Sequence, residues 1–270
     1  MFALFLSPTL ITKFTSSLDM AIQHIKIITD LVYSGIRWLR DFQDPARDQA
    51  SRIINAFEAH GIPRQQILRI LPTDIEIPFK AFSNVENLRN NLSLSLLDWS
   101  AEFLALNRNW LDGVGKKPHQ FLDGYKNESI YIRWFESRIM AVSADHRKLV
   151  IWSSNDLNNT PNSNGYLSIV YVESNYGYDG NEISRYWSLS DRWRADHKPC
   201  IDSMSKIVEI CCLLDILVIG RIVKQSVIER YETGQLFAPE VNSYTRSFWY
   251  PEDLVEVRML RESEILSKNH

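Results

Sequence analysis

Basic and aromatic residues alternate in one short stretch of the chain, which begins at Arg185 and ends at Arg194. Guanidinium groups beside indole and phenol rings are able to hold an anionic ligand or to stack on nucleic-acid bases. We therefore take Arg185 and Arg194 as candidate ligand-binding residues. The simpler interpretation is that Tyr186 and Trp193 pack into the core while the arginines stay in water.

A second group that could do chemistry contains His197, Cys200, Cys211 and Cys212. A structural zinc site needs two ligand pairs whose thiolates converge, whereas neighbouring cysteines on a helix point about 100° apart. A Cys200 nucleophile with His197 as its base lacks an oxyanion hole in the nearby sequence. We predict no metal site and no cofactor, and we interpret the cysteines as small buried side chains in a reducing compartment.

Acidic residues flank a predicted hairpin turn, at Glu173, Asp179 and Glu182. Paired carboxylates can act as acid and base or bind a divalent cation, but acidic residues beside a turn are usually solvated. The sequence contains none of the glycine-rich phosphate loops, serine elbows or zinc-binding His-Glu motifs typical of common enzyme classes. We expect that the protein is not an enzyme, although an enzyme that uses the Arg185–Arg194 region remains an alternative.

The composition sets limits on the class of protein. The 270 residues are 45% hydrophobic and 23% charged, with ten glycines and ten prolines, which excludes disordered and collagen-like chains. The net charge is −3, so any nucleic-acid binding must come from a local patch. No run of apolar residues is long enough to cross a membrane, and Met1–Ile11 lacks the features of a signal peptide. We expect a cytoplasmic protein, with Met1 or Met20 as its start.

Hydrophobic spacing predicts helices in the first part of the chain. In residues 1–45, one apolar stripe from Leu18 to Asp41 indicates an amphipathic helix, which we consider a candidate homodimer element. In residues 46–117, the pattern predicts helices over Ala46–His60 and Pro63–Leu71 and a further helix capped by Ser93.

Residues 118–270 change in character and predict an α+β domain. Short β-prone runs are expected to form strands, with a helix over Ile201–Leu214 later in the chain. Because these runs are too close together for crossover helices, we expect an antiparallel sheet with packed helices. The runs are Ser129–Phe135, Arg138–Val142, Leu149–Trp152, Leu167–Glu173 and Glu182–Trp187.

Residues Ser51–Gly113 contain the one pattern that points to a family. A helix capped by Ser93 carries the small residue Ala101, and a loop with Leu106 leads to Trp110-Leu111-Asp112-Gly113. Together with Gly61-Ile62-Pro63-Arg64-Gln65-Gln66, this resembles the helix-turn-helix domain of the lambda-repressor/Cro-like superfamily. The resemblance implies binding to double-stranded DNA, with Gln65 or Gln66 on the phosphate backbone.

The expected recognition helix departs from that family. Residues 74–84 contain two acids and Pro78 where the family has a short polar helix. Candidates for DNA contact there are Lys80, Asn84 and Arg89, because Lys, Asn and Arg side chains contact base edges or phosphates. Nine basic and eight acidic residues between Ala46 and Lys117 leave a local charge of only +1.

The sequence thus predicts an α+β protein with a helix-turn-helix-like region before its sheet domain. Our leading hypothesis is a DNA-binding transcriptional regulator whose C-terminal domain senses a ligand or forms a dimer. The alternative is a non-enzymatic protein-interaction module whose helix-turn-helix scaffold no longer binds DNA.

Overall fold

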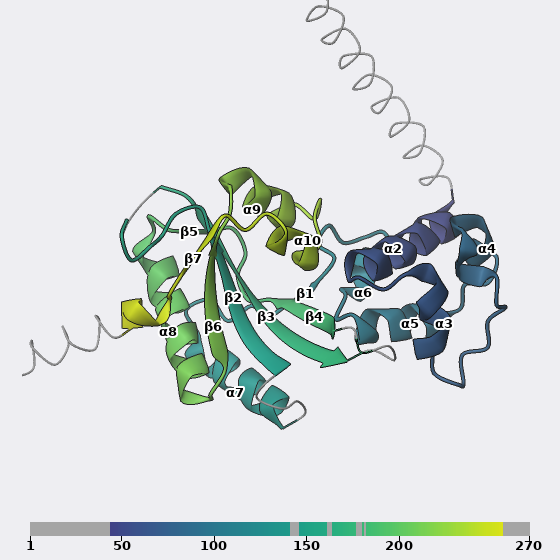
Figure 1. Cartoon of the computed structure of the whole chain (residues 1–270), viewed down its shortest axis with the longest axis horizontal. Coiled ribbons are helices and arrows are strands. Elements are labelled where there is room, and N and C mark those ends of the chain that lie inside the picture. The colour runs from purple at the N-terminus through teal and green to yellow at the C-terminus, as the bar shows by residue number, and fades with distance from the viewer. Residues whose placement is uncertain (1–43, 141–145, 161–163, 177–179, 181, 256–270) are drawn as a thin grey trace, which may run out of the picture. The chain divides into compact units, whose positions relative to one another are not determined.

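A computed structural model describes residues 44–140, 146–160, 164–176, 180 and 182–255 (Figure 1). By its contacts the chain divides into two units, Met1–Asp48 and Gln49–His270. Residues 44–48 are the described part of the first unit. The amphipathic helix predicted over Leu18–Asp41, with its proposed role in dimer formation, lies outside the described residues.

Short helices form the first described part of the chain. They are α2 (Pro45–Ala59), α3 (Arg64–Ile70), the 3₁₀ helix η1 (Ala81–Ser83), α4 (Val85–Arg89), α5 (Leu94–Phe103) and α6 (Arg108–Leu111). Gly61, with a φ of 77°, follows α2 in the left-handed conformation that glycine adopts without strain. The Ser93 hydroxyl accepts a hydrogen bond from the Leu96 amide at 3.1 Å and caps α5, as the sequence predicted.

These helices share a hydrophobic core of their own. Ile53 and Phe57 of α2, Ile67 of α3, Leu88 of α4 and Leu96 of α5 are almost completely buried in it. The Phe57 ring also stacks on Trp99 and Phe103, with centroids 5.6 and 6.1 Å away. Apolar packing therefore holds α2, α3, α4 and α5 together, although three of these helices have ten residues or fewer.

The second part of the chain builds a seven-stranded sheet with the order β1-β4-β3-β2-β6-β7, in which β5 pairs with β3. The strands are β1 (Gln120–Phe121), β2 (Arg147–Ser153), β3 (Tyr166–Tyr176), β4 (Glu182–Ser188), β5 (Trp193–Arg194), β6 (Leu217–Ile222) and β7 (Ser247–Trp249). The class is α+β, as predicted.

The expectation of a purely antiparallel sheet was wrong. β2 pairs with β6 in parallel, and β1 pairs with β4 in parallel, whereas β2–β3, β3–β4, β3–β5 and β6–β7 are antiparallel. The short strands seen in the sequence do form hairpins. The parallel pairs join strands far apart in the chain, and these long connections leave room for α7 or α8.

Helices cover both faces of the sheet. One face carries α7 (Glu128–Ile139) and α8 (Lys198–Leu213), and the other carries α9 (Gln225–Glu232) and α10 (Ala238–Asn242) (Figure 1). Alternate residues of β3 separate accordingly: Ile169 and Tyr171 join the core with α7 and α8, while Val170 and Val172 join the core with α9 and α10.

Helix α7 corrects the strand prediction for Ser129–Phe135 and for the start of Arg138–Val142. The region is rich in β-prone residues, but Tyr131 and Phe135, four positions apart, are its fully buried side chains. Both rings lie on the core shared with the sheet. Burial of this helical stripe therefore outweighs the local β propensity.

Two buried histidines join the helical part to the sheet. His60, which follows α2, and His119, which precedes β1, have ring centroids 5.5 Å apart, beside Tyr186 and Phe237. The His60 Nδ1 donates a hydrogen bond to the Ala56 carbonyl at 2.7 Å, and the His119 Nε2 accepts one from the Ala238 amide at 2.9 Å. Each ring is therefore held as a neutral tautomer.

Burial lowers the pKa of His60 from 6.5 to about 4. Burial, with repulsion from His60, lowers the pKa of His119 well below its usual value. The two histidines therefore bind protons more readily in the unfolded chain than in the folded chain. The free energy of unfolding decreases as the pH falls below their unfolded pKa near 6.5.

We expect the free energy of unfolding to fall between pH 7 and pH 5, with about 2 kcal/mol of the loss due to His60 alone. Urea unfolding at the two pH values measures this loss for the wild type and for His60→Leu, whose pH dependence should be smaller. His197→Gln, at an exposed histidine, is the matched control. An equal pH dependence in wild type and His60→Leu would contradict the assignment.

Candidate functional site

The residues predicted to contact DNA lie in the helical part of the chain. Gln65 is exposed in the first turn of α3, and the half-buried Gln66 follows it. Lys80 is exposed just before η1. Asn84 and Arg89 mark the beginning and the end of α4.

The geometry between α3 and η1 differs from a helix-turn-helix. Such motifs join their two helices through a turn of three or four residues. Here the ten residues Leu71–Lys80 separate α3 from η1 and contain no helix, and α4 is only five residues long. The two acids and Pro78 that distinguish the sequence from the family lie in this non-helical segment.

Intramolecular contacts engage two of the five candidates. The Asn84 side chain accepts a hydrogen bond from the Asn87 amide at 2.8 Å and so caps α4. The Arg89 guanidinium pairs with Glu86 at 2.6 Å. Gln65 and Lys80 are therefore the candidates whose side chains are exposed and take no part in the contacts that hold α4.

The two arginines proposed to bind one ligand are not brought together. Arg185 lies opposite Glu173 on β3, whereas Arg194 lies opposite Tyr166 on the same strand. These positions of β3 are seven residues apart, which corresponds to about 23 Å along a strand. Arg194 pairs instead with Asp196 at 2.6 Å on the surface. The structure therefore does not bring Arg185 and Arg194 together at one site.

Arg185 belongs to a charged cluster that links several elements. Arg138 of α7 makes two hydrogen bonds to the fully buried Glu173 carboxylate, one of them at 2.6 Å, and Arg185 lies 3.9 Å from it. The Arg138 and Arg185 guanidinium groups lie 4.5 and 5.0 Å from the Trp187 ring. Arg185 also donates to the Glu102 carbonyl of α5 at 3.1 Å. This cluster stabilises the packing of α7, the sheet and α5.

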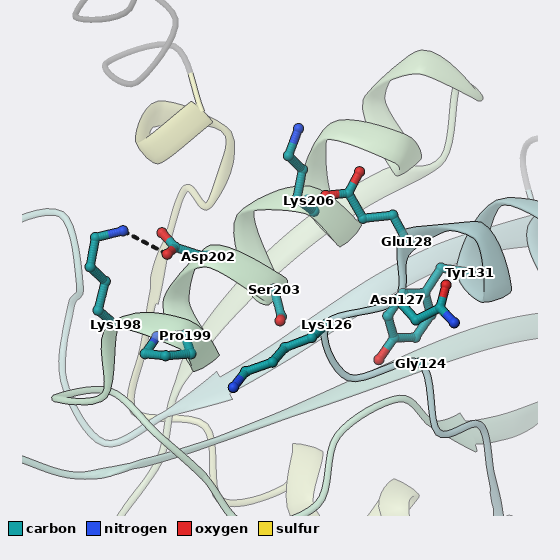
Figure 2. A pocket seen from close by; sticks show the side chains of 10 residues that line it. All are labelled: Gly124, Lys126, Asn127, Glu128, Tyr131, Lys198, Pro199, Asp202, Ser203 and Lys206. Atoms are coloured by element: carbon teal, nitrogen blue, oxygen red, sulfur yellow. Dashed lines mark hydrogen bonds and ion pairs between the residues drawn. The ribbon is translucent and has the colours of Figure 1, made fainter.

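A cavity that the sequence did not reveal lies beside the beginnings of α7 and α8 (Figure 2). Its volume is about 430 Å³. Ten residues line it: Gly124, Lys126, Asn127, Glu128 and Tyr131 before and in α7, and Lys198, Pro199, Asp202, Ser203 and Lys206 in α8.

Close packing fixes the turn that precedes α7. A methyl group on Gly124 would lie 2.6 Å from the Tyr131 ring, so glycine alone fits there. The Tyr131 hydroxyl donates to the Leu189 carbonyl at 3.0 Å, and burial raises the pKa of this phenol. Lys126 adopts a φ of 59°, a conformation that non-glycine residues rarely occupy. The backbone that presents Lys126 to the cavity is therefore held in one arrangement.

The lysines of the cavity differ in their partners. Lys198 pairs with Asp202 at 2.6 Å, and Lys206 pairs with Glu209 at 3.0 Å. The Lys126 ammonium lies 5.0 Å from the Tyr125 ring and pairs with no carboxylate in the described part of the chain. In Figure 2 the Lys126 side chain extends across the cavity towards α8.

Ser203 supplies a second free polar group. It is only 9% exposed, and its hydroxyl has no hydrogen-bond partner among the residues that the structure describes. Figure 2 shows this hydroxyl on the cavity side of α8, facing the region of Lys126. An ammonium and a hydroxyl, both able to donate hydrogen bonds, thus converge from two elements of the fold.

Few features of the sequence indicate this site. Lys126 and Ser203 lie in segments 77 positions apart, and neither belongs to a recognisable motif. Pro199 at the beginning of α8 was the one local signal, because it marks a helix start.

No family model, curated protein or solved structure matches the chain. Within the described ranges, no group of three or more His, Cys, Asp or Glu side chains is placed to hold a metal ion. The helices of the described residues include none with the length and apolar character needed to span a membrane.

We expect Gly124→Ala to lower the free energy of unfolding by about 1–3 kcal/mol, because the added methyl group overlaps the Tyr131 ring. Urea unfolding measures the loss. Glu136→Ala, an exposed position on α7, is the control and should change stability by less than about 0.5 kcal/mol. Equal stabilities for Gly124→Ala and wild type would show that the turn before α7 is not fixed in this way.

Proposed function

We propose that this chain is a ligand-binding protein whose α+β part senses a small polar molecule in the cavity between α7 and α8. The observation that carries the proposal is the convergence of Lys126 and Ser203, two unpaired donors, on a cavity of about 430 Å³. Pockets of this size with a few convergent polar groups are typical of small-molecule sites. The role is that of the sensing domain in our leading hypothesis from the sequence.

We place this role in the cytoplasm. Of the three cysteines of the chain, Cys200 and Cys211 are buried and form no disulfide. Burial raises the pKa of Cys211 well above its usual value, so this thiol stays protonated. Unpaired, protonated thiols are the state that a reducing compartment maintains.

Filling the cavity should abolish ligand binding. Saturation-transfer NMR identifies small-molecule fragments that bind the wild-type protein. We expect these fragments not to bind Ser203→Phe, because the phenylalanine ring occupies the space beside Lys126. Ser226→Phe, at an exposed position of α9, is the matched control and should keep them. Far-UV circular dichroism checks that both variants are folded.

The same fragments binding equally to wild type and to a folded Ser203→Phe protein would exclude the cavity as the site. If Ser203→Phe does not fold, fragment binding is measured for Lys126→Glu instead. Its side chain is exposed, so the substitution reverses the charge at the cavity with little effect on packing.

The second function that we propose is binding of double-stranded DNA by the helical part, as in a transcriptional regulator. It is supported by the resemblance to lambda-repressor-like domains and by the exposure of Gln65 and Lys80. Polar side chains near a helix N-terminus commonly contact phosphates and set the orientation on the duplex. A homodimer would present two such surfaces to two half-sites.

The alternative, a protein-interaction module, is favoured by a different observation. Phe79, next to Lys80 in the segment that separates α3 from η1, is 87% exposed. An exposed aromatic ring is suited to a protein partner and contributes nothing to phosphate neutralisation.

If the helical part binds DNA, Lys80→Ala should weaken retention of genomic duplex fragments and lower the slope of log affinity against log salt by about one. Gln65→Ala should weaken retention with less change in slope, because the amide carries no charge. Filter binding at two salt concentrations measures both effects, and Lys224→Ala, an exposed lysine before α9, is the control. Absence of salt-dependent retention by the wild-type protein would exclude this function and leave the ligand-binding proposal intact.

A further inference from the structure

We propose that the ligand of the cavity between α7 and α8 carries a phosphoryl group, which Lys126, Ser203 and the first turn of α7 bind together. The inference rests on the proposed ligand-binding function and specifies the chemical class of the ligand. The proposed function rests on the presence of the cavity, and the class of ligand is inferred from the unpaired hydrogen-bonding groups that line it.

Two unpaired side chains at the cavity can donate hydrogen bonds. Lys126 offers an ammonium, and Ser203, nine-tenths buried, offers a hydroxyl. The first amides of an α-helix have no partner within the helix. The N-cap of α7 is Asn127, and its side chain makes no capping hydrogen bond. The Ile130 amide donates to the Asn127 carbonyl at 3.2 Å, so the Glu128 and Ser129 amides are the ones at this end of α7 that face an acceptor at the cavity edge.

A phosphoryl group matches this set better than a carboxylate. It has three acceptor oxygens and a charge of about −1.5 to −2 at pH 7, whereas a carboxylate has two oxygens and a single negative charge. Hydrogen bonds from an ammonium to an anionic oxygen are among the strongest in proteins.

Lys126 and two helix N-termini favour an anion at the cavity. Of the three lysines that line it, Lys198 pairs with Asp202 and Lys206 pairs with Glu209, whereas Lys126 has no carboxylate partner among the described residues. Helix α7 has 12 residues and α8 has 16, and both begin at the cavity, so that their positive dipole ends add to the field. Glu128 is the acid that opposes this field from the first turn of α7.

The volume allows more than an inorganic ion. A cavity of about 430 Å³ holds a phosphoryl group together with a small organic part. The expected class is therefore a small phosphorylated metabolite, for which pyrophosphate and glycerol phosphate are simple probes.

Isothermal titration calorimetry of the full chain with pyrophosphate, glycerol phosphate and acetate tests the proposal. We expect both phosphorylated probes to bind at least tenfold more tightly than acetate. Lys126→Gln should weaken pyrophosphate binding at least tenfold and Ser203→Ala about threefold, because they remove a charge-assisted and a neutral hydrogen bond. Lys224→Gln, at an exposed lysine elsewhere, should leave the affinity unchanged.

Two results would overturn the inference. Acetate binding as tightly as pyrophosphate would show that the site does not select phosphoryl groups. Pyrophosphate binding that Lys126→Gln and Ser203→Ala leave unaltered would place the anion elsewhere.

The fragment experiment on Ser203→Phe separates this inference from the proposed function. One outcome is that fragments bind the wild-type protein but not Ser203→Phe, and that no phosphorylated probe binds. This outcome would overturn the proposed class of ligand and leave the ligand-binding function standing. If neither fragments nor phosphates bind the cavity, the proposed function fails as well.

Discussion

The buried carboxylate of Glu173 is the charge around which one side of the sheet is organised. A fully buried carboxylate is stable only when it is paired and hydrogen-bonded, so its two bonds to Arg138 fix the last turn of α7 against β3. Arg185 completes the neutralisation from β4 and extends the connection to the end of α5. The Trp187 ring lies beside both guanidinium groups. The end of α7, the centre of the sheet and the helical part of the chain therefore depend on a single group.

The opposite end of α7 is fixed by shape rather than by charge. The Tyr131 ring fills the space above Gly124, and its hydroxyl reaches the Leu189 carbonyl. With both ends held, α7 presents Lys126 and its own first turn at a constant position beside α8. A site formed by such rigid elements is preorganised, so that less conformational entropy is lost when a ligand binds. The cavity is thus a consequence of the packing that stabilises α7.

Buried polar contacts also join the helical part to the sheet. Lys117, in the segment after α6, pairs with the buried Glu232 of α9 at 2.6 Å, and Ser168 of β3 donates to the same carboxylate. Burial raises the pKa of Glu232 in spite of the lysine. The pair of neutral histidines lies on the same side of the sheet, against Tyr231 of α9. The helical part is therefore joined to the sheet on both faces, by Arg185 on the side of α7 and by these contacts on the side of α9.

The sequence by itself determined much of the local structure. The helices α2, α3, α5 and α8 and the hairpin of β3 and β4 follow from apolar spacing, proline and glycine positions and the cap at Ser93. These signals act within a few residues, because backbone hydrogen bonds and φ preferences are local. The α+β class followed from them.

Tertiary structure decided everything that depends on contacts between distant residues. It made a helix of Glu128–Ile139, whose β-prone side chains pack as one stripe on the sheet, and it paired β2 with β6 in parallel. It placed Arg185 and Arg194 beside distant positions of β3 and placed Arg185 next to the Glu173 carboxylate. It also brought Lys126 towards Ser203, two residues that no sequence motif connects. The physical reason is that burial and charge pairing depend on which helices and strands are in contact, and these contacts exist only in the folded chain.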